Sequence, residues 1–226
     1  MLINADFNRS AHCDTRQAAW IDSPQGGVQR IALDRLGEEM ARATSLVRYA
    51  PGSRFPLHVH GGGEEILVLD GVFSDAQGDY PAGSYLRNPP LSQHAPWSQP
   101  GCTLLVKLWQ FQPGDEQTVR ILAEQQHWQG LPDGRQCCTL HHFAAEVVTL
   151  EQWPAGFSAQ EPCAGGLELL VLDGELAADG QHWAAGSWLR LPAGHTLHWH
   201  SHGARLWLKR GHLSAPDCWA LRGAQA

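Results

Sequence analysis

Apolar residues along this chain fall in short runs, and glycine, proline, aspartate and asparagine separate these runs. In the first half the runs are TSLVRYA (44–50), EEILVLDGVF (64–73), GSYLR (83–87) and CTLLVKLWQF (102–111). Many short β-rich runs with turn-forming residues between them predict a β-sandwich or jelly-roll barrel. Helix is sparse, and its clearest candidate, residues 115–127, is a short segment that could join two halves of the chain.

The second half of the chain repeats the first. GEEILVLDG at 63–71 returns as GLELLVLDG at 166–174, and GSYLRNP at 83–89 returns as GSWLRLP at 186–192. Both blocks are displaced by the same 103 residues, and a constant offset across separate blocks indicates duplication. A turn signal at 112–115 precedes the junction. We therefore expect two tandem β-barrel domains, residues 1–118 and residues 119–226.

Composition excludes several classes of partner. The chain has 226 residues, of which 43% are hydrophobic and 17% are charged, as in an ordinary globular protein. Its net charge of −7 and sequence pI near 6.0 argue against nucleic acid or an anionic membrane as a direct partner. No apolar run is long enough for a transmembrane helix, and MLINADFNRS lacks the features of an export signal. We expect a cytoplasmic protein whose six cysteines are reduced.

The strongest chemical signal is a motif in the first half. Gly52, His58, His60, Glu64 and Gly71 stand in the order G-x5-H-x-H-x3-E-x6-G. Two histidines one residue apart on a strand project from the same face, and the three glycines that follow them can turn the chain and return the glutamate. Two imidazoles and a carboxylate suit a divalent ion such as Zn, Fe, Mn or Ni. The alternative is a pair of surface histidines without a ligand role.

These residues and several neighbouring motifs resemble a known family. The stretch GEE-x-LVL-x-G-x-F-x-D, the RNPP element and the Gly101-Cys102 pair before VKLWQF accompany the H-x-H-x3-E motif. Pro81-x-Gly83 lacks the histidine that usually follows it in cupins, and His94 stands further along instead. Together these features resemble the cupin-like domain of ChrR-type anti-sigma factors, strongly over residues 20–112 and weakly in the second copy.

The resemblance implies a fold and a metal site. It implies an all-β bicupin, with two tandem cupin (jelly-roll β-barrel) domains. It also implies one divalent metal ion in the first domain, generally zinc, with iron, manganese or nickel as alternatives. The ligands that it implies are His58, His60, Glu64 and His94.

Three functional classes fit these expectations. The resemblance implies a regulatory, oxidant-sensing module with a sigma factor as a possible protein partner, but the H-x3-C-x2-C motif that holds the sigma factor is not found here. The second class is a metal-dependent cupin dioxygenase for a small diketone- or phenol-like substrate. The third is a structural metalloprotein or small-ligand binder. A hydrophobic pocket beside His58 and His60 would favour the enzyme, whereas tightly held zinc without turnover would favour the others. Any of these proteins could be a homodimer.

The second copy has lost the motif. At the same offset, the four ligand positions become Glu161, Cys163, Leu167 and Leu197. We therefore expect no equivalent metal site there, and we expect aromatic residues to fill the interior instead, namely Trp153, Trp183 and Trp188. An aromatic pocket for an apolar ligand is the alternative.

Other residues have open roles. A different soft-ion site could form in the second copy from Glu161 or Cys163 with the histidines at 195, 198, 200 and 202 (His195, His198, His200, His202), although exposed strand histidines are simpler. Cys137-Cys138 with His141-His142 lacks the spacing of a metal cluster.

In the first copy, Glu65 should point away from the ligand cluster on a regular strand, to serve as a partner near the site or at the surface. Tyr85 and Lys107 could line the cavity or pack at the core edge. Three further residues have no assigned role: Arg48, Arg87 and Cys102, of which the cysteine is a possible oxidant target.

Overall fold

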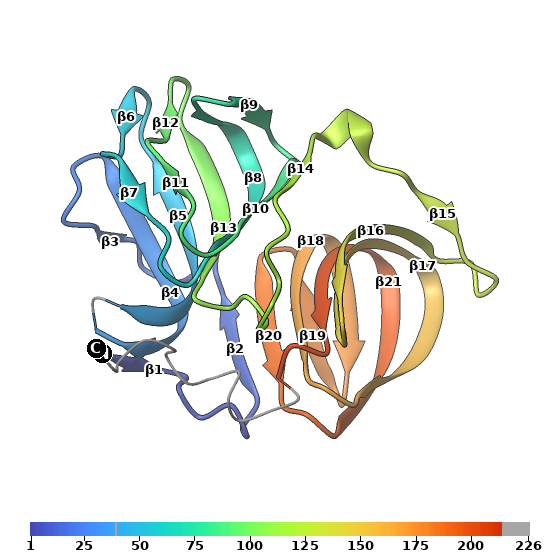
Figure 1. Ribbon diagram of the computed structural model, residues 1–226. Coiled ribbons are helices and arrows are strands. Elements are labelled where there is room, and N and C mark those ends of the chain that lie inside the picture. The colour runs from blue at the N-terminus through green and yellow to red at the C-terminus, as the bar shows by residue number, and fades with distance from the viewer. Residues whose placement is uncertain (39, 214–226) are drawn as a thin grey trace. The chain divides into compact units, whose positions relative to one another are not determined.

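The computed structural model describes residues 1–38 and 40–213, apart from the side chains of residues 161 and 162. Within these ranges almost every element is a β-strand (Figure 1). The only helix in this part of the chain is a 3-10 turn, η1 (Ala123–Gln125). The all-β prediction is therefore confirmed. Among the described residues, no helix has both the length and the apolar character needed to span a bilayer.

The helix expected over residues 115–127 is wrong for most of its length. β14 (Val119–Ile121) lies in this segment and pairs antiparallel with β10 (Tyr85–Asn88). Sheet pairing satisfies the backbone N–H and C=O groups of an edge segment as well as a helix would, so the tertiary context decides the conformation.

Two compact units make up the fold, and neither is a continuous stretch of chain. The first contains Met1–Ala5 and Ala19–Gln125, and the second contains Asp6–Ala18 and the described residues from Gln126 onward. The early segment Asp6–Ala18 belongs to the second unit because its strand β2 (Ala11–Asp14) pairs antiparallel with β20 (Ser187–Leu191). Backbone hydrogen bonds of residues 11–15 thus join this segment to the sheet of the second barrel.

The first unit is an antiparallel β-barrel. Its main path of neighbouring strands is β1 (Leu2–Ile3), β4 (Val28–Gly37), β5 (Ala41–Tyr49), β13 (Cys102–Leu108), β8 (Glu64–Asp75), β10 and β14. Short strands complete it: β3 (Ile21–Asp22), β6 (Ser53–Arg54), β9 (Gly78–Pro81) and β12 (Trp97–Ser98). A separate two-stranded sheet joins β7 (His58–Val59) to β11 (Gln93–His94).

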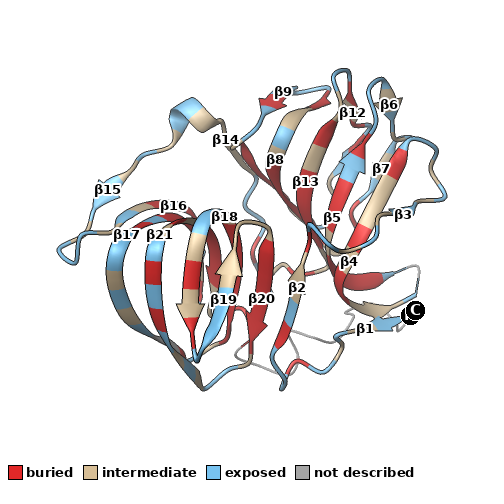
Figure 2. Ribbon diagram, turned by 180° about the vertical axis from the view of Figure 1, so that it is seen from behind, coloured by how far each residue is buried: buried red, intermediate tan, exposed pale blue. Residues whose placement is uncertain are grey.

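Side chains that alternate along the long strands fill the first barrel. Val47 and Tyr49 of β5 and Leu104 and Val106 of β13 belong to one buried cluster, as the period of two for a strand requires. In this barrel, buried residues are concentrated on the long strands, whereas most exposed residues lie on turns and short edge strands (Figure 2). The barrel interior is therefore apolar except where the functional side chains enter it.

The second unit is a barrel of the same kind. Its neighbouring strands are β15 (Gln129–Gly130), β16 (Gln136–Phe143), β17 (Glu146–Cys163), β21 (His195–Arg210), β18 (Leu167–Ala178), β20 and β2, with β19 (Gln181–Ala184) paired to β18. Trp153 lies in the core cluster and Trp183 packs against that cluster. The expectation for Trp188 is wrong, because its neighbour Leu189 is the core residue on β20 and Trp188 occupies the opposite face, where its indole Nε1 donates to Glu168.

A glycine at the same place in each barrel permits a close approach of two backbones. Gly71 and Gly174 both have φ of +72°. A Cβ on Gly71 would lie 2.0 Å from the carbonyl oxygen of Gly101, and a Cβ on Gly174 would lie 1.8 Å from that of Gly203. Only glycine adopts the left-handed backbone conformation readily and also has no Cβ to clash with the neighbouring carbonyl oxygen. The repeated LDG sequence therefore encodes a structural contact.

We predict that Gly71→Ala lowers the free energy of unfolding by about 3 kcal/mol or more, because backbone strain and a steric clash add. Gly52→Ala is the matched control, since Gly52 has φ of +75° and nothing within 4 Å of the added Cβ. Strain alone should cost that variant about 1–2 kcal/mol. Denaturant unfolding of both variants measures the difference, and equal losses would contradict the role given to the clash.

Candidate metal centre

The four residues predicted as ligands come together at one end of the first barrel. β7 and β11 pair antiparallel, and this register places His58 directly opposite His94. His60 follows β7, and its backbone N–H donates to the carbonyl of Ser92 at 2.9 Å. Glu64 is the first residue of β8. Three separate strands thus deliver the side chains, and backbone pairing fixes their spacing.

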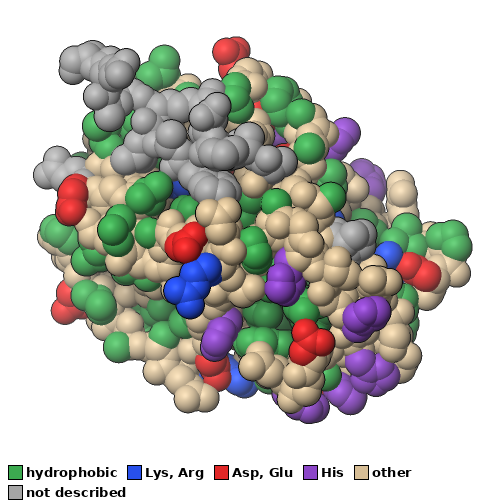
Figure 3. Space-filling model, turned by 90° about the horizontal axis from the view of Figure 1, so that it is seen from below, with side chains coloured by type: hydrophobic (Ala, Val, Ile, Leu, Met, Phe, Trp, Pro, Cys, Tyr) green, Lys and Arg blue, Asp and Glu red, His purple; other side chains and the backbone are tan. Residues whose placement is uncertain are grey.

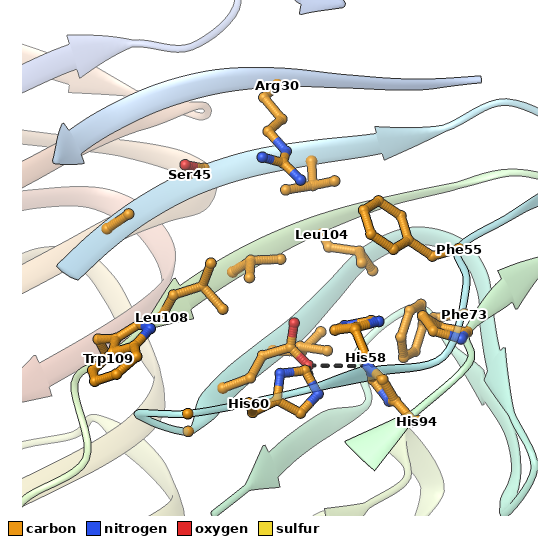
Figure 4. Close-up of a pocket in the computed structure, with 18 of the residues that line it drawn as sticks. Arg30, Ser45, Phe55, His58, His60, Phe73, His94, Leu104, Leu108 and Trp109 are labelled. Atoms are coloured by element: carbon orange, nitrogen blue, oxygen red, sulfur yellow. Dashed lines mark ion pairs between the residues drawn. The ribbon is translucent and has the colours of Figure 1, made fainter. Parts of the chain in front are cut away.

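The side chains of His58, His60 and His94 face one another (Figure 4). One ligand atom from each of the four residues lies within 4.8 Å of the others. The Oε2 atom of Glu64 lies 3.4 Å from Nε2 of His60 and 3.4 Å from Nε2 of His94. His60, Glu64 and His94 are buried, whereas His58 is half-buried. The cluster is therefore closed on one side and accessible beside His58.

Neighbouring groups orient these side chains. Nδ1 of His58 lies 2.9 Å from the carbonyl oxygen of Pro56, and Nδ1 of His94 lies 3.4 Å from Oδ2 of Asp75. Burial acts to raise the pKa of Asp75, but its contacts with His94 and the backbone N–H of Gln77 outweigh burial and lower this pKa. An ionised carboxylate behind a histidine fixes the ring and increases its basicity as a ligand. The free Nε2 atoms consequently face the cluster.

Glu64 is held from its other side. Nδ2 of Asn88 donates to Oε2 of Glu64 at 3.0 Å, and Nη2 of Arg120 donates to Oδ1 of the same asparagine at 2.5 Å. Asn88 belongs to the RNPP element, so this part of the sequence motif has a structural explanation. The carboxylate is positioned before any ligand binds, as a preorganised site requires.

The donor set fits a divalent ion. Nε2 of His60 and Nε2 of His94 are buried and have no hydrogen-bond partner among the described residues. Burial lowers the pKa of His60, partly offset by Glu64, so this imidazole favours its neutral form. A buried nitrogen without a partner costs free energy, and a metal ion would take its lone pair. Three imidazoles and one carboxylate suit zinc, iron, manganese or nickel.

The glycine turn before Glu64 is covered by an aromatic ring. A Cβ on Gly61 or Gly62 would lie 2.8 or 2.3 Å from the side chain of Trp109. The backbone N–H of Trp109 donates to the carbonyl of Gly63 at 3.1 Å, which anchors the indole at this turn. No sequence pattern marks this residue beyond its position directly after β13. Its ring closes one wall of the cavity described next.

A cavity of about 190 Å³ adjoins the cluster. All four predicted ligands line it, together with polar groups of Arg30, Arg35, Ser45 and Tyr49. The rest of its wall is mainly apolar: Val47, Phe55, Ile66, Phe73, Leu104, Val106, Leu108 and Trp109. A mainly apolar cavity with a few polar groups is typical of a small-molecule site.

Several residues with open roles lie outside this cavity. Glu65 is buried, and its Oε2 accepts from Nη1 of Arg87 at 3.0 Å, so it is not a surface residue. Tyr85 and Lys107 are also buried but do not line the cavity, and the lysine Nζ donates to Oγ1 of Thr44 at 2.8 Å. Arg48 stacks over Trp20 with its Cζ 4.3 Å from the ring centroid. All four lie on the opposite strand face from the cavity residues, as strand alternation predicts for Glu65, and Tyr85 and Lys107 pack in the sheet instead of lining the cavity.

The second barrel does not reproduce the cluster in its described part. Cys163 and Leu167 are buried in its core and Leu197 packs against them, while the side chain of Glu161 lies outside the described residues. His198, His200 and His202 are exposed on the other face of β21, so they do not join Cys163. Histidines also gather on one part of the surface in Figure 3.

One other group of metal-type donors is found among the described residues. It consists of Glu175, His182 and His202, and none of the three is buried. Nδ1 of His182 lies 2.8 Å from Oε1 of Glu175, so the carboxylate already has a partner. This group shares only His202 with the soft-ion site that the sequence suggested for the second copy. Cys137-Cys138 and His141-His142 do not form such a group in the described residues.

Together, this fold and site define a class of protein. An antiparallel β-barrel that carries H-x-H, a glutamate and a later histidine on its inner face is a cupin. The family model described as ChrR Cupin-like domain matches residues 8–112 and again residues 116–214. The chain therefore belongs to the ChrR Cupin-like family, as a bicupin with two copies of the domain.

Solved structures support the fold. A candidate dioxygenase from Nostoc punctiforme gives a TM-score of 0.72 at 14% identity, covering 96% of this chain and 88% of that chain. Ylba from E. coli gives 0.70 at 11% identity, covering 92% and 93%. An oxalate decarboxylase from Lactobacillus farciminis, in a formate complex, gives 0.61 at 10% identity, covering 88% and 86%. No functionally curated protein matches the sequence significantly.

We predict that His60→Ala removes most of the bound divalent metal, because it deletes a buried donor of the cluster. Cys163→Ala, at the equivalent position of the second barrel, should change metal content little. Elemental analysis of both proteins, purified without chelators, checks this. Equal loss in the two variants would show that the second barrel also binds metal.

We also predict that Cys102 is unreactive at neutral pH. Burial raises the pKa of this thiol to about 11, so roughly 0.1% is thiolate at pH 8. Because the folded pKa lies above the ordinary value of 9.0, the thiol stabilises the fold below pH 9, and this contribution is lost as pH rises through 11. Peptide mass spectrometry after iodoacetamide treatment should show rapid labelling only in denaturant. Rapid labelling of folded protein at pH 8 would refute the assignment.

Proposed function

We propose that the first barrel is a metal-dependent enzyme site for a small organic molecule. The observation that carries this proposal is the cavity of about 190 Å³ that opens directly onto the ligand cluster. A purely structural metal site needs no such space, because its ligands close around the ion. An apolar cavity also excludes water from the reacting atoms and strengthens the electrostatic interactions inside.

The reaction that fits best is dioxygenation of a diketone- or phenol-like substrate. For a β-diketone, a carbon–carbon bond breaks and both atoms of O₂ enter the products, which are a carboxylic acid and a 1,2-dicarbonyl compound. A redox-active divalent ion bound by His58, His60, Glu64 and His94 would supply the Lewis acidity and electron transfer that this chemistry needs. Iron is the most suitable choice, and zinc would leave the dioxygenase inactive.

The residues of this chain have distinct tasks in the proposal. The half-buried edge of His58 leaves a route to the cluster, while the indole of Trp109 covers its glycine turn. Burial first, and then the charge of Glu64, raise the pKa of Tyr49, so its phenol stays protonated as a hydrogen-bond donor at the cavity wall. Asn88 and Asp75 keep Glu64 and His94 in place.

The second candidate is a regulatory, oxidant-sensing module with zinc, which the match to the ChrR Cupin-like family favours. Thiol chemistry does not support it, because burial raises the pKa of each cysteine for which a shift is resolved: Cys13, Cys102, Cys137 and Cys138. Sensing would then have to act through the metal site. A sigma-factor partner, a homodimer and a cytoplasmic location stay predictions.

The enzyme proposal predicts oxygen uptake by protein reconstituted with Fe(II) when a small β-diketone or a catechol is added. His94→Ala should lower this uptake at least about 100-fold, since it removes a proposed ligand. His198→Ala is the matched control, because this histidine is exposed on the second barrel. An oxygen electrode and elemental analysis give the answer. About one zinc per chain and no uptake with the whole panel would favour the sensing or structural function.

A further inference from the structure

We propose that Arg30 binds an acid group of the substrate, so that the cavity selects small carboxylates. This inference rests on the proposed function in one respect, namely that the cavity holds a substrate. Arg30 lies on β4, and its guanidinium points into the cavity from the wall opposite the histidine cluster (Figure 4). The sequence did not identify this residue.

The sheet register explains why two arginines face the interior. Val28 and Arg30 pair with Tyr49 and Val47, which are core residues of β5. The register then shifts between Ala32 and Asp34, so one extra residue of β4 has no partner on β5. This bulge changes the parity of the strand, and Arg35 pairs with Ala43, another cavity residue. Positions 30 and 35 therefore share a face although their numbers differ by an odd count.

Arg30 has no bonding partner among the described residues. Its Nε atom is buried without a hydrogen bond, and no ion pair joins its guanidinium to a described carboxylate. Burial lowers the pKa of Arg30, but a guanidinium remains charged at neutral pH. Arg30 as a whole is half-buried, so its guanidinium is partly removed from water, and an anion with two oxygens can meet the planar fork of this side chain.

Other arginines of this chain show the contrast. Arg87 is fully buried and donates to Glu65 at 3.0 Å and to Asp115 at 2.6 Å. Arg135 forms ion pairs with Asp133 at 2.8 Å and with Glu151 at 3.2 Å. Arg87 and Arg135 thus have carboxylate partners, whereas Arg30 lines the cavity.

The charge of the cavity also favours an anion. Among the described lining residues, Arg30 and Arg35 are positive and Glu64 is the only carboxylate. Two positive charges against one negative charge leave a formal charge of +1, which a divalent ion would raise further. In a low-dielectric cavity this field attracts anions and strengthens their binding.

The arrangement defines the chemical class of the ligand. An acid group would contact Arg30, oxygen donors would face the histidine cluster, and an apolar middle would lie against side chains such as Leu104 and Val106. A small diketo acid or a hydroxylated aromatic acid has these three parts. A neutral diketone lacks the first part and should bind more weakly.

Calorimetry on zinc-loaded full-length protein tests this without turnover. The two probes are 2,4-dioxopentanoate and pentane-2,4-dione, which differ only by a carboxylate in place of one methyl group. Wild type should bind the acid at least about tenfold more tightly than the dione. Arg30→Met should weaken binding of the acid by about ten- to hundredfold and change binding of the dione less than about threefold.

Two further variants control for folding and for charge. Arg48→Met removes an equal charge from β5 outside the cavity and should leave both affinities unchanged. Arg30→Lys keeps the charge but loses the fork, and it should lose less affinity for the acid than Arg30→Met. Zinc content and thermal melting confirm that each variant is folded. If Arg30→Met does not fold, Arg30→Lys takes its place in the test. Weaker binding of the acid by Arg30→Lys than by Arg48→Met would then support the role of Arg30, and equal binding would overturn it.

The outcomes separate this inference from the proposed function. No preference for the acid in wild type, or an unchanged preference in Arg30→Met, overturns the role of Arg30. The same loss in Arg48→Met overturns it as well. An Arg30-dependent preference without oxygen uptake by the Fe(II) form would support the acid site and refute the dioxygenase. Oxygen uptake with the dione, together with acid binding that does not depend on Arg30, would support the dioxygenase and refute the acid site.

Discussion

The contact of one carboxylate with two buried imidazole nitrogens governs the architecture of the first barrel. Glu64 lies 3.4 Å from Nε2 of both His60 and His94, a separation at which none of them is satisfied by the others. Such an arrangement is unfavourable unless a cation completes it. The surrounding structure maintains it, since Asp75 holds one histidine, Asn88 holds the glutamate, and the barrel is closed behind them.

Much of this could be predicted from the sequence because it depends on simple periodicity. Alternation along a strand places His58 and His60 on one face, and the repeat with an offset of 103 residues indicates two barrels. Alternation fails where a strand is irregular. The bulge in β4 brings Arg35 to the same wall as Arg30, and no local pattern marks that shift. The role of Trp109 was equally hidden, because it depends on a turn almost fifty residues away.

Other errors arose where a partner distant in sequence decides the outcome. Residues 119–121 form a strand because β10 offers an edge, whatever their helical preference. For Tyr85 and Lys107 the sequence left two roles open and for Arg87 it assigned none, and the structure places all three, buried, on the face of the sheet away from the cavity. The second barrel keeps the scaffold, including its counterpart of Gly71, while Cys163 and Leu167 occupy the places of two ligands. Duplication has thus preserved the backbone and changed the chemistry of one interior.

The position of β2 has a consequence for how the two halves of the chain can be separated. This strand, Ala11–Asp14, hydrogen-bonds to β20, although most of the second barrel begins more than a hundred residues later. A polypeptide that starts at residue 126 would leave the edge of β20 unpaired, and open strand edges invite aggregation. The family match that begins at residue 8 includes this strand with the first copy. The two domains are therefore separate repeats in sequence, but the sheet of the second barrel is complete only with a strand from the N-terminal segment. Separating the repeats at their sequence boundary would remove that strand.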